Sequence, residues 1–403
     1  MSDLLPRLRG DLDMMPSPVP GRPGLLMRDP FHYSDSVLIV PPALVECLRL
    51  FDGESTETDL RALLVRLSGD IRVGDMLHGF VKTLSEAGFV HDEVYERMKA
   101  GRESAFANAP ERTPALAGAA YPADAGGTAA LISGYMNGSK PRSGLVGIAA
   151  PHVSLDGGAE CYAAAYGALG PELRDRTFVI IGTSHYGGPE RFGLTRKPFV
   201  TPLGTARTAA DLVDELERFG GPAVKMEDYC HAVEHSIEFQ VLFLQHLFGP
   251  EVRILPVLCG PFVHSIFEGG LPEETEAVGR FLEALRQMGE REASRLFWVL
   301  GVDMAHMGRR YGDPHAVAAN RGIMTGVAAE DKRRIELIAA GDAPGFWTAV
   351  AADQDPLRWC GAAPIYTFLK AAPGARGELL GYRQWNIDEQ SVVSFAALAF
   401  SKR

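Results

Sequence analysis

Short, strongly apolar runs alternate with helical stretches from about Tyr121 onward, and this alternation constrains the fold most. Runs this short and apolar are typical of strands buried on both faces of a parallel sheet. Such a sheet needs helices against both faces. The runs are "LVGIAA" (Leu145–Ala150), "TFVIIG" (Thr177–Gly182), "VRILPVLC" (Val252–Cys259) and "LFWVLGV" (Leu296–Val302). We predict a layered α/β/α domain with a mainly parallel sheet over residues 116–403.

The first 97 residues have a different pattern. "HYSDSVLIV" (His32–Val40) predicts a strand, and Pro41-Pro42 suits the first turn of a helix over "ALVECLRLF". "STETDLRALLVRL" offers Ser55 or Thr56 as the cap of a second helix, and "VGDMLHGFVKTLSEAGFVHD" predicts a third. We predict a small winged-helix-like domain over 1–97. Residues 98–115, rich in Ala, Pro, Glu and Arg, are predicted to be a linker.

The partner of this first domain can be narrowed by charge. The third helix carries little positive charge: Lys82 lies on it and Arg72 just before it. Contacts between basic side chains and phosphates supply most non-specific affinity for DNA. A nucleic-acid partner is therefore not favoured. The stretch "RPGLLMRDPF…LIVPPALVECLRLFDG…LSEAGFV" resembles the small domains of the PqqD-like peptide-binding family. That resemblance implies a peptide or protein partner.

Composition sets the broad class. The 403 residues are 46% hydrophobic and 23% charged, with a formal net charge of −11, which argues against nucleic acid or an anionic membrane as the main partner. No run approaches the ~20 apolar residues that cross a bilayer. The start, "MSDLLPRLRGDLDMM", does not have the apolar core of a signal peptide. Five scattered cysteines fit a reducing compartment, so we expect a cytoplasmic protein.

Histidines lie within a few residues of the ends of three of the predicted strands. His152 follows the first, His185 the second, and Asp303 and His306 the fourth. Ligands of open α/β sheets collect outside the carboxyl ends of the strands. The three imidazoles are therefore predicted to share one cleft, where they could bind a metal. The alternative for each is a loop histidine with only local hydrogen bonds.

Two further segments carry candidate site residues. Cys360 precedes a predicted helix, whose positive end favours the metal-ligating thiolate; the alternative is a small buried hydrophobic side chain. In "EHSIEFQ", His235 and Glu238 lie three residues apart and could form a buried acid/base pair or a solvated first turn.

The segment "HAVEH" matches the inverted zinc-peptidase signature H-x-x-E-H. In that interpretation His231 and His235 bind zinc and Glu234 activates water. The pattern is short, and the required third ligand is not identified by the sequence. We carry it as an alternative function.

Eight segments in order resemble the Memo family, also called AmmeMemoRadiSam system protein B. They are "AGAAYPAD", "APHVSLDGGAECYAAAY", "IIGTSHYGG", "FVTPLGTA", "EHSIEFQVLFLQ", "VDMAHMGRRYGD", "WCGAAPIYTFL" and "DEQSVVSFAALAF". The resemblance implies a fold similar to class III extradiol dioxygenases, which are non-haem iron enzymes.

The resemblance also implies a site. Motif by motif, the metal ligands fall on His152, His185 and Cys360; His306 and Asp303 fall on pocket residues, and His235 falls near them. We expect Fe, Cu or Zn, because a thiolate softens a two-histidine site.

Two departures affect the predicted pocket. The family's A-P-H-A-G-Y motif is replaced after His152 by Val153-Ser154-Leu155, and the aspartate usual after "TPLG" is delayed to Asp211. The pocket wall, and hence the small-molecule or peptide ligand, can therefore differ from the family's.

These residues lead to a functional hypothesis. We expect a metal-binding protein with a dioxygenase-like pocket and oxygen-dependent or redox chemistry on a small molecule. His306 would be the general acid/base, with His235 assisting and Asp303 orienting one of them. The alternative is a non-catalytic metal- or peptide-binding module.

Overall fold

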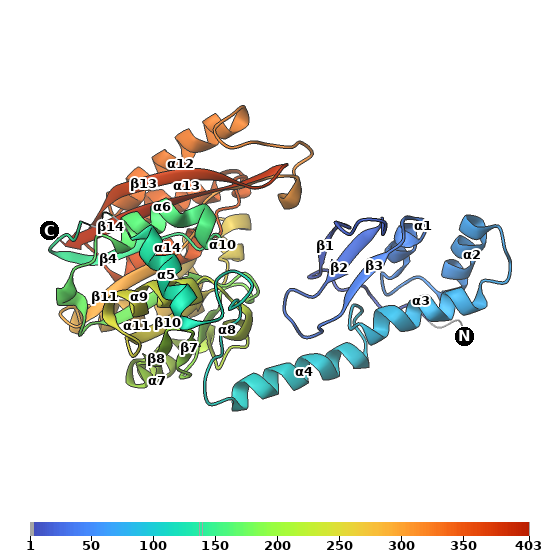
Figure 1. Ribbon diagram of the computed structural model, residues 1–403, viewed down its shortest axis with the longest axis horizontal. Helices are drawn as coiled ribbons and strands as arrows, with labels where there is room; N and C mark the ends of the chain where they lie inside the picture. The colour runs from blue at the N-terminus through green and yellow to red at the C-terminus, as the bar shows by residue number, and fades with distance from the viewer. Residues whose placement is uncertain (1–3, 137, 139, 403) are drawn as a thin grey trace. The chain divides into compact units, whose positions relative to one another are not determined.

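The computed structural model describes residues 4–136, 138 and 140–402. The chain divides into two compact units, Met1–Asn108 and Ala109–Arg403 (Figure 1). The first unit has one hydrophobic core and the second has two.

The first unit combines a small antiparallel sheet with helices. The sheet has the order β1-β2-β3. Thr56 rather than Ser55 caps α2: its side chain accepts from the Asp59 amide, and the Asp59 carboxylate accepts from the Thr56 amide. The elements are β1 (Asp13–Pro16), β2 (Leu25–Arg28), β3 (Val37–Val40), α1 (Pro42–Val45), α2 (Glu57–Ser68), α3 (Gly74–Glu86) and α4 (Glu93–Asn108).

The segment predicted to be a linker, 98–115, is largely ordered as helix. Helix α4 runs through its first part to Asn108, because Ala, Glu, Lys and Arg favour helix even where no regular apolar stripe is present. Pro110 follows the helix end, and Arg112 already belongs to the second unit.

The second unit contains a large sheet whose centre is parallel, as predicted. Its strand order is β12-β14-β4-β11-β5-β10-β6-β9, and β4, β11, β5 and β10 are parallel neighbours. Antiparallel strands complete both edges. The strands are β4 (Leu145–Ala150), β5 (Thr177–Thr183), β6 (Phe192–Leu194), β7 (Phe199–Thr201), β8 (Gly204–Thr208), β9 (Val224–Met226), β10 (Arg253–Cys259), β11 (Leu296–Gly301), β12 (His306–Gly308), β13 (Ala375–Asp388) and β14 (Ser391–Lys402).

Helices cover both faces of this sheet. In β5, Phe178 and Ile180 join one core and Val179 and Ile181 the other, because successive side chains of a strand point to opposite faces. The first core includes α5 (Ala125–Tyr135), α6 (Leu155–Tyr166) and α9 (Glu238–Phe248). The second includes α7 (Ala210–Phe219), α11 (Glu276–Arg291), α12 (Ile323–Ala339), α13 (Ala343–Ala351) and α14 (Ala362–Ala371).

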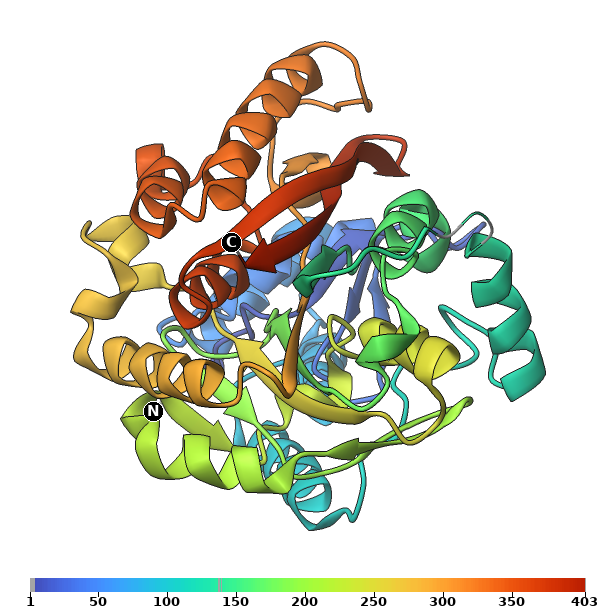
Figure 2. The same cartoon turned by 90° about the vertical axis from the view of Figure 1, so that its left-hand side faces the viewer.

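Figure 2 shows the sheet between these two groups of helices, which confirms the predicted layered α/β architecture. Two short helices, α8 (Cys230–Val233) and α10 (Val263–Phe267), lie in connections. None of the helices in the described part of the chain combines the length and apolar character needed to cross a membrane.

Candidate metal centre

The candidate site lies where neighbouring parallel strands end. In the sheet, β11 lies between β4 and β5, and the three strands run in the same direction. His152 follows β4, His185 follows β5 and Asp303 follows β11. Parallel strands bring their carboxyl ends to one edge, so the fold itself places these residues together.

Three imidazoles converge at this edge. The ring centroids of His152 and His185 are 4.9 Å apart, and that of His235 lies 5.3 Å from His152 and 5.2 Å from His185. One nitrogen from each ring lies within 4.8 Å of the others, close enough for all three to reach one metal ion. His235 comes from the turn before α9 rather than from a strand end.

Contacts on Nδ1 fix two of these rings. The His152 Nδ1–H donates to the Gly301 carbonyl at 2.9 Å, and the His185 Nδ1–H donates to the Glu234 carboxylate at 3.0 Å. In each ring this makes Nε2 the nitrogen that a metal ion could take in exchange for a proton. Metal-ligating histidines in proteins are usually held in this way by a carbonyl or carboxylate on the second nitrogen.

Cys360 adds a sulfur next to the imidazoles. Its Sγ lies 3.4 Å from His152 Nε2, and its carbonyl accepts from Thr183 Oγ1 at 3.1 Å. Burial raises the pKa of the Cys360 thiol, but the positive charges of His152 and His306 outweigh it and lower the pKa to about 5. Cys360 is therefore a thiolate at neutral pH, the form that binds metal.

The pKa of His152 is shifted in the opposite direction, upward. Burial lowers its pKa, but Asp303 and the Cys360 thiolate outweigh burial and raise it to about 9. Asp303 Oδ1 also accepts from the His152 amide at 3.0 Å, and Oδ2 lies 3.6 Å from Nε2. Without metal the site thus holds an imidazolium–thiolate pair, and a cation would displace the proton.

Glu234 is a site residue that sequence reasoning assigned only to the peptidase alternative. Its buried carboxylate contacts the Nδ1 atoms of His185 and His235 and accepts from the amides of His185, His235 and Ser236. Burial raises the pKa of Glu234, but the neighbouring His185 holds it far below its usual range. The only sequence signal for this role was its position directly before His235.

His306 lies beside the three-histidine group without belonging to it. It begins β12, and its Nδ1–H donates to the Met304 carbonyl at 2.9 Å. The Tyr311 ring stands edge-on to it, with ring centroids 4.9 Å apart. As in His152, the Nε2 of His306 is left as the free nitrogen.

Glu238 is not brought to His235. It is buried in an ion pair with Arg112, accepts from the Tyr121 hydroxyl, and accepts from the amides of Ala115 and Leu116 at 2.8 and 3.0 Å. Helix α9 begins only at Glu238, and His235 precedes it. The two side chains therefore do not share a helical face, although they lie three residues apart in the sequence. The carboxylate that does contact His235 is Glu234.

His231 does not share a helical face with His235. Helix α8 ends at Val233, and Glu234 has an extended backbone with ψ 137°. The His231 Nε2–H is buried against the Gly193 carbonyl at 3.0 Å. The geometry of the inverted zinc-peptidase signature, with two histidines four apart on one helix, is therefore not formed.

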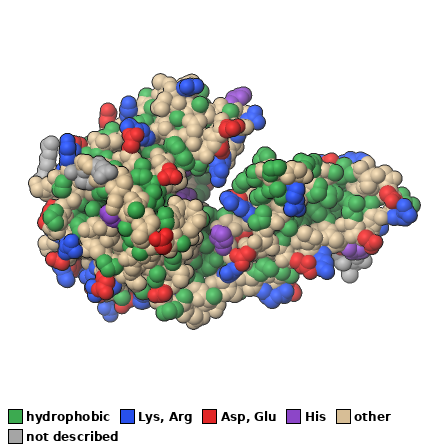
Figure 3. Space-filling view, in the orientation of Figure 1, with side chains coloured by type: hydrophobic (Ala, Val, Ile, Leu, Met, Phe, Trp, Pro, Cys, Tyr) green, Lys and Arg blue, Asp and Glu red, His purple; other side chains and the backbone are tan. Residues whose placement is uncertain are grey.

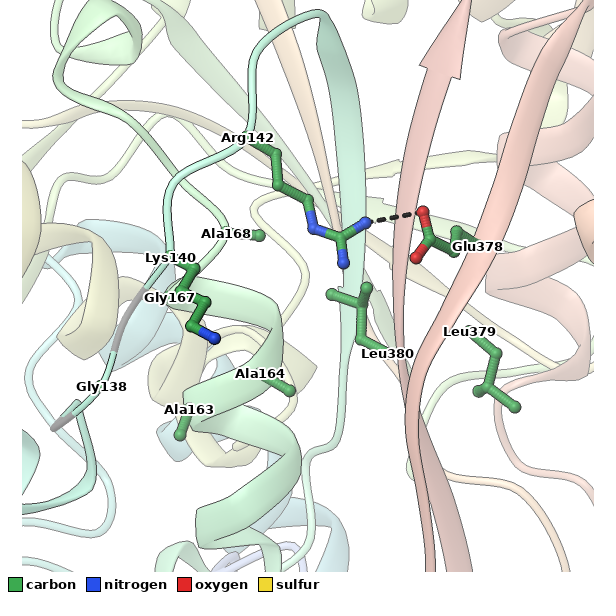
Figure 4. Close-up of a pocket in the computed structure, with 10 residues that line it drawn as sticks. All are labelled: Gly138, Lys140, Arg142, Ala163, Ala164, Gly167, Ala168, Glu378, Leu379 and Leu380. Carbon is green, nitrogen blue, oxygen red and sulfur yellow. Dashed lines mark hydrogen bonds and ion pairs between the residues drawn. The ribbon is translucent and has the colours of Figure 1, made fainter.

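A surface hollow elsewhere carries none of these residues. It lies beside α6 and β13 and is lined by Gly138, Lys140, Arg142, Ala163, Ala164, Gly167, Ala168, Glu378, Leu379 and Leu380 (Figure 4). The exposed Arg142 is already paired with Glu378, at 2.6 Å. The histidine cluster is thus the stronger candidate for a functional site.

Comparison with known proteins supports the sequence resemblance. A family model described as Memo-like protein matches residues 112–399. A MEMO1 family protein of Aquifex aeolicus is 27% identical, over 93% of this chain and 95% of that protein. One from Ignicoccus hospitalis is 35% identical, over 72% of this chain and 98% of that protein. One from Methanopyrus kandleri is 28% identical, over 72% of this chain and 99% of that protein.

Proposed function

Because this chain belongs to the family of Memo-like proteins, we propose that it is a metal-binding protein whose ligands are His152, His185 and Cys360, with His235 as a fourth donor. The observation that carries this proposal is the convergence of three imidazole nitrogens within 4.8 Å of one another beside a thiolate sulfur. His152 and His185, which are anchored through Nδ1, can each present a free Nε2.

The spacing of the donors fits a metal ion. Zinc-type bonds of about 2.0–2.1 Å to nitrogen and 2.3 Å to sulfur put tetrahedral N and S ligands about 3.6 Å apart. The His152 Nε2 and Cys360 Sγ atoms are 3.4 Å apart. Imidazole with thiolate suits Zn, Cu(I) and Fe(II). The proposed ligands are nitrogen and sulfur donors, whereas Mg²⁺ and Ca²⁺ prefer hard oxygen ligands.

We propose a dioxygenase-like pocket with redox chemistry on a small molecule. A redox-active metal, when bound, would supply electron transfer. His306 is suited to hold or accept a proton at Nε2, because its Nδ1–H is held by the Met304 carbonyl. Asp303 orients His152, and Glu234 orients His185 and His235.

Metal analysis of anaerobically purified protein tests the site. We expect about one ion per chain in the wild type and loss of most of it in Cys360→Ser and His185→Ala. Cys259→Ser, which changes a buried cysteine outside the cluster, is the matched control and should keep the metal. Full metal content in Cys360→Ser together with loss in His231→Ala would instead support the peptidase alternative.

Oxygen uptake separates an enzyme from a binding module. The metal-loaded protein is tested with a panel of phenolic and reduced small molecules. Metal-dependent uptake that is lost in His306→Ala would support the redox proposal. Bound metal with no uptake on any compound would favour the non-catalytic alternative.

A further inference from the structure

Two polar side chains next to the proposed metal ligands, His306 and Tyr311, come from one short stretch of chain. His306 begins β12, and Tyr311 ends the 3₁₀ turn Arg309–Tyr311 that follows this strand. Their rings stand edge-on, with centroids 4.9 Å apart. His306 also lies close enough to the Cys360 sulfur for its charge to lower the pKa of that thiol. The pair therefore flanks the candidate metal centre.

The Tyr311 hydroxyl has no protein partner. Within the part of the chain that the structure describes, no residue makes a hydrogen bond with it. Tyr135, which is also partly buried, donates to Asp156 at 2.6 Å, and Tyr382 donates to Asp331 at 2.7 Å. Tyrosine hydroxyls that are removed from water usually find such a partner. The hydroxyl of Tyr311 is therefore available to a ligand.

The charges that act on Tyr311 relate its hydroxyl to the site. Burial is the main cause that raises the pKa of Tyr311; Arg310 lowers it, and the charges of Cys360 and Asp303 raise it further. The phenol is therefore protonated at neutral pH and can donate a hydrogen bond. Because Cys360 and Asp303 both act on it, the hydroxyl lies within electrostatic reach of the candidate metal centre.

The position of Tyr311 is fixed without its hydroxyl. The Arg310 amide donates to Ser391 Oγ at 3.0 Å, and the Gly308 amide donates to the Asp313 carboxylate at 2.7 Å. The Tyr311 ring packs against the core that α6 and α9 help to form. Since none of these contacts uses the phenol oxygen, phenylalanine in place of Tyr311 should keep the same local structure.

We propose that Tyr311 is a ligand-binding residue of the metal centre, whose hydroxyl donates a hydrogen bond to an oxygen atom of a small molecule held beside the metal. His306 Nε2, which makes no hydrogen bond within the described chain, is the second polar group that such a molecule would meet. The ligand class is then an oxygen-donor molecule. This inference rests on the proposed function, because the molecule is held beside the proposed metal.

Two probes that differ in their donor atoms test the proposal. The full-length protein is loaded with Co(II), whose visible absorption reports ligand binding, and is titrated with acetohydroxamate or imidazole. Acetohydroxamate binds a metal through oxygen atoms that can also accept a hydrogen bond. Imidazole binds through one nitrogen, and its second nitrogen can only donate.

The isosteric variant Tyr311→Phe should separate the two probes. We expect it to bind acetohydroxamate about tenfold more weakly than the wild type does, the value of one good hydrogen bond. Its affinity for imidazole and its Co(II) content should not change. Tyr135→Phe makes the same substitution at a tyrosine that donates to Asp156, and it should match the wild type in all three measurements.

Equal acetohydroxamate affinity in the wild type and Tyr311→Phe would overturn the proposal. An equal loss for imidazole would also overturn it, because that result indicates a structural role. So would failure of the Co(II)-loaded wild type to bind acetohydroxamate. In these three cases the bound Co(II) leaves the metal site standing. A wild type that takes up no Co(II) would refute the metal site and, with it, the role of Tyr311.

Discussion

Glu234 reaches both His185 and His235, and the two imidazole planes are nearly parallel, 7° apart. A single buried carboxylate thus sets the orientation of two candidate ligands. His152 is oriented separately, by the Gly301 carbonyl. The three rings are therefore held by contacts with neighbouring segments of the chain.

Glu234→Gln should weaken metal binding without removing any ligand. The glutamine amide has one accepting oxygen and no charge, whereas Glu234 uses one oxygen for His185 and the other for His235. We therefore expect a 10- to 100-fold lower affinity, the usual cost of losing such a contact. Competition with a chromophoric chelator measures it. Glu276→Gln, in the exposed first turn of α11, is the control and should leave affinity unchanged.

Alkylation of the metal-free protein should report the Cys360 thiolate. Because the Cys360 pKa is lowered to about 5, the thiolate persists from pH 8 to pH 6, and its rate with iodoacetamide should change less than about twofold. An ordinary thiol would slow by about tenfold per pH unit there. Peptide mass spectrometry identifies the modified residue.

The other cysteines provide an internal comparison in the same experiment. Burial raises the pKa of Cys47, Cys161, Cys230 and Cys259, so they should stay unlabelled in the folded chain. His152→Ala removes the main favourable charge and should slow the Cys360 reaction at pH 6. A steep fall in the wild-type rate between pH 8 and pH 6 would contradict the assignment.

At the scale of elements, a buried ion pair joins the start of α9 to the segment that precedes α5. Arg112 and Glu238 are both buried, and Arg112 also donates to the carbonyls of His231 and Glu234, at 2.8 and 2.9 Å. This network holds the segment that carries Glu234 and His235. It is a structural support for the site rather than part of it.

Glu238→Gln should therefore destabilise the fold. It would leave the Arg112 charge buried without its partner, which typically costs about 3–5 kcal/mol of unfolding free energy. Denaturant unfolding measures it. Glu378→Gln breaks the exposed pair with Arg142 and should cost about 0–1 kcal/mol. Similar values for both variants would contradict a structural role for the buried pair.

The parallel strands and the positions of His152 and His185 could be predicted, because apolar runs mark buried strands and strand ends share one edge. The role of Glu238 could not. It depends on where α9 begins, and its partner Arg112 lies 126 residues away, in a segment with no regular pattern. The pairing of Glu234 with His185 is equally non-local, since it forms only after β5 is placed in the sheet.

At the scale of the whole molecule, all the candidate ligands belong to the second unit. The relatives from Ignicoccus and Methanopyrus match 72% of this chain over nearly their whole length, about the share that Ala109–Arg403 represents, whereas the Aquifex relative matches 93%. Figure 3 shows Lys and Arg side chains intermixed with Asp and Glu on the second unit. For the first unit we propose a peptide or protein partner, on the basis of its sequence resemblance.

The second unit should fold and bind metal alone, provided that its start is chosen from the structure. We expect residues 109–403 to keep one ion per chain, because they contain the site and the Arg112–Glu238 pair. A chain of residues 116–403, the boundary predicted from sequence, lacks Arg112 and the Ala115 amide that bind Glu238. It should be less stable by about 3–5 kcal/mol, as in Glu238→Gln. Denaturant unfolding of both fragments and metal analysis check this; equal stability would show that Arg112 does not fasten α9.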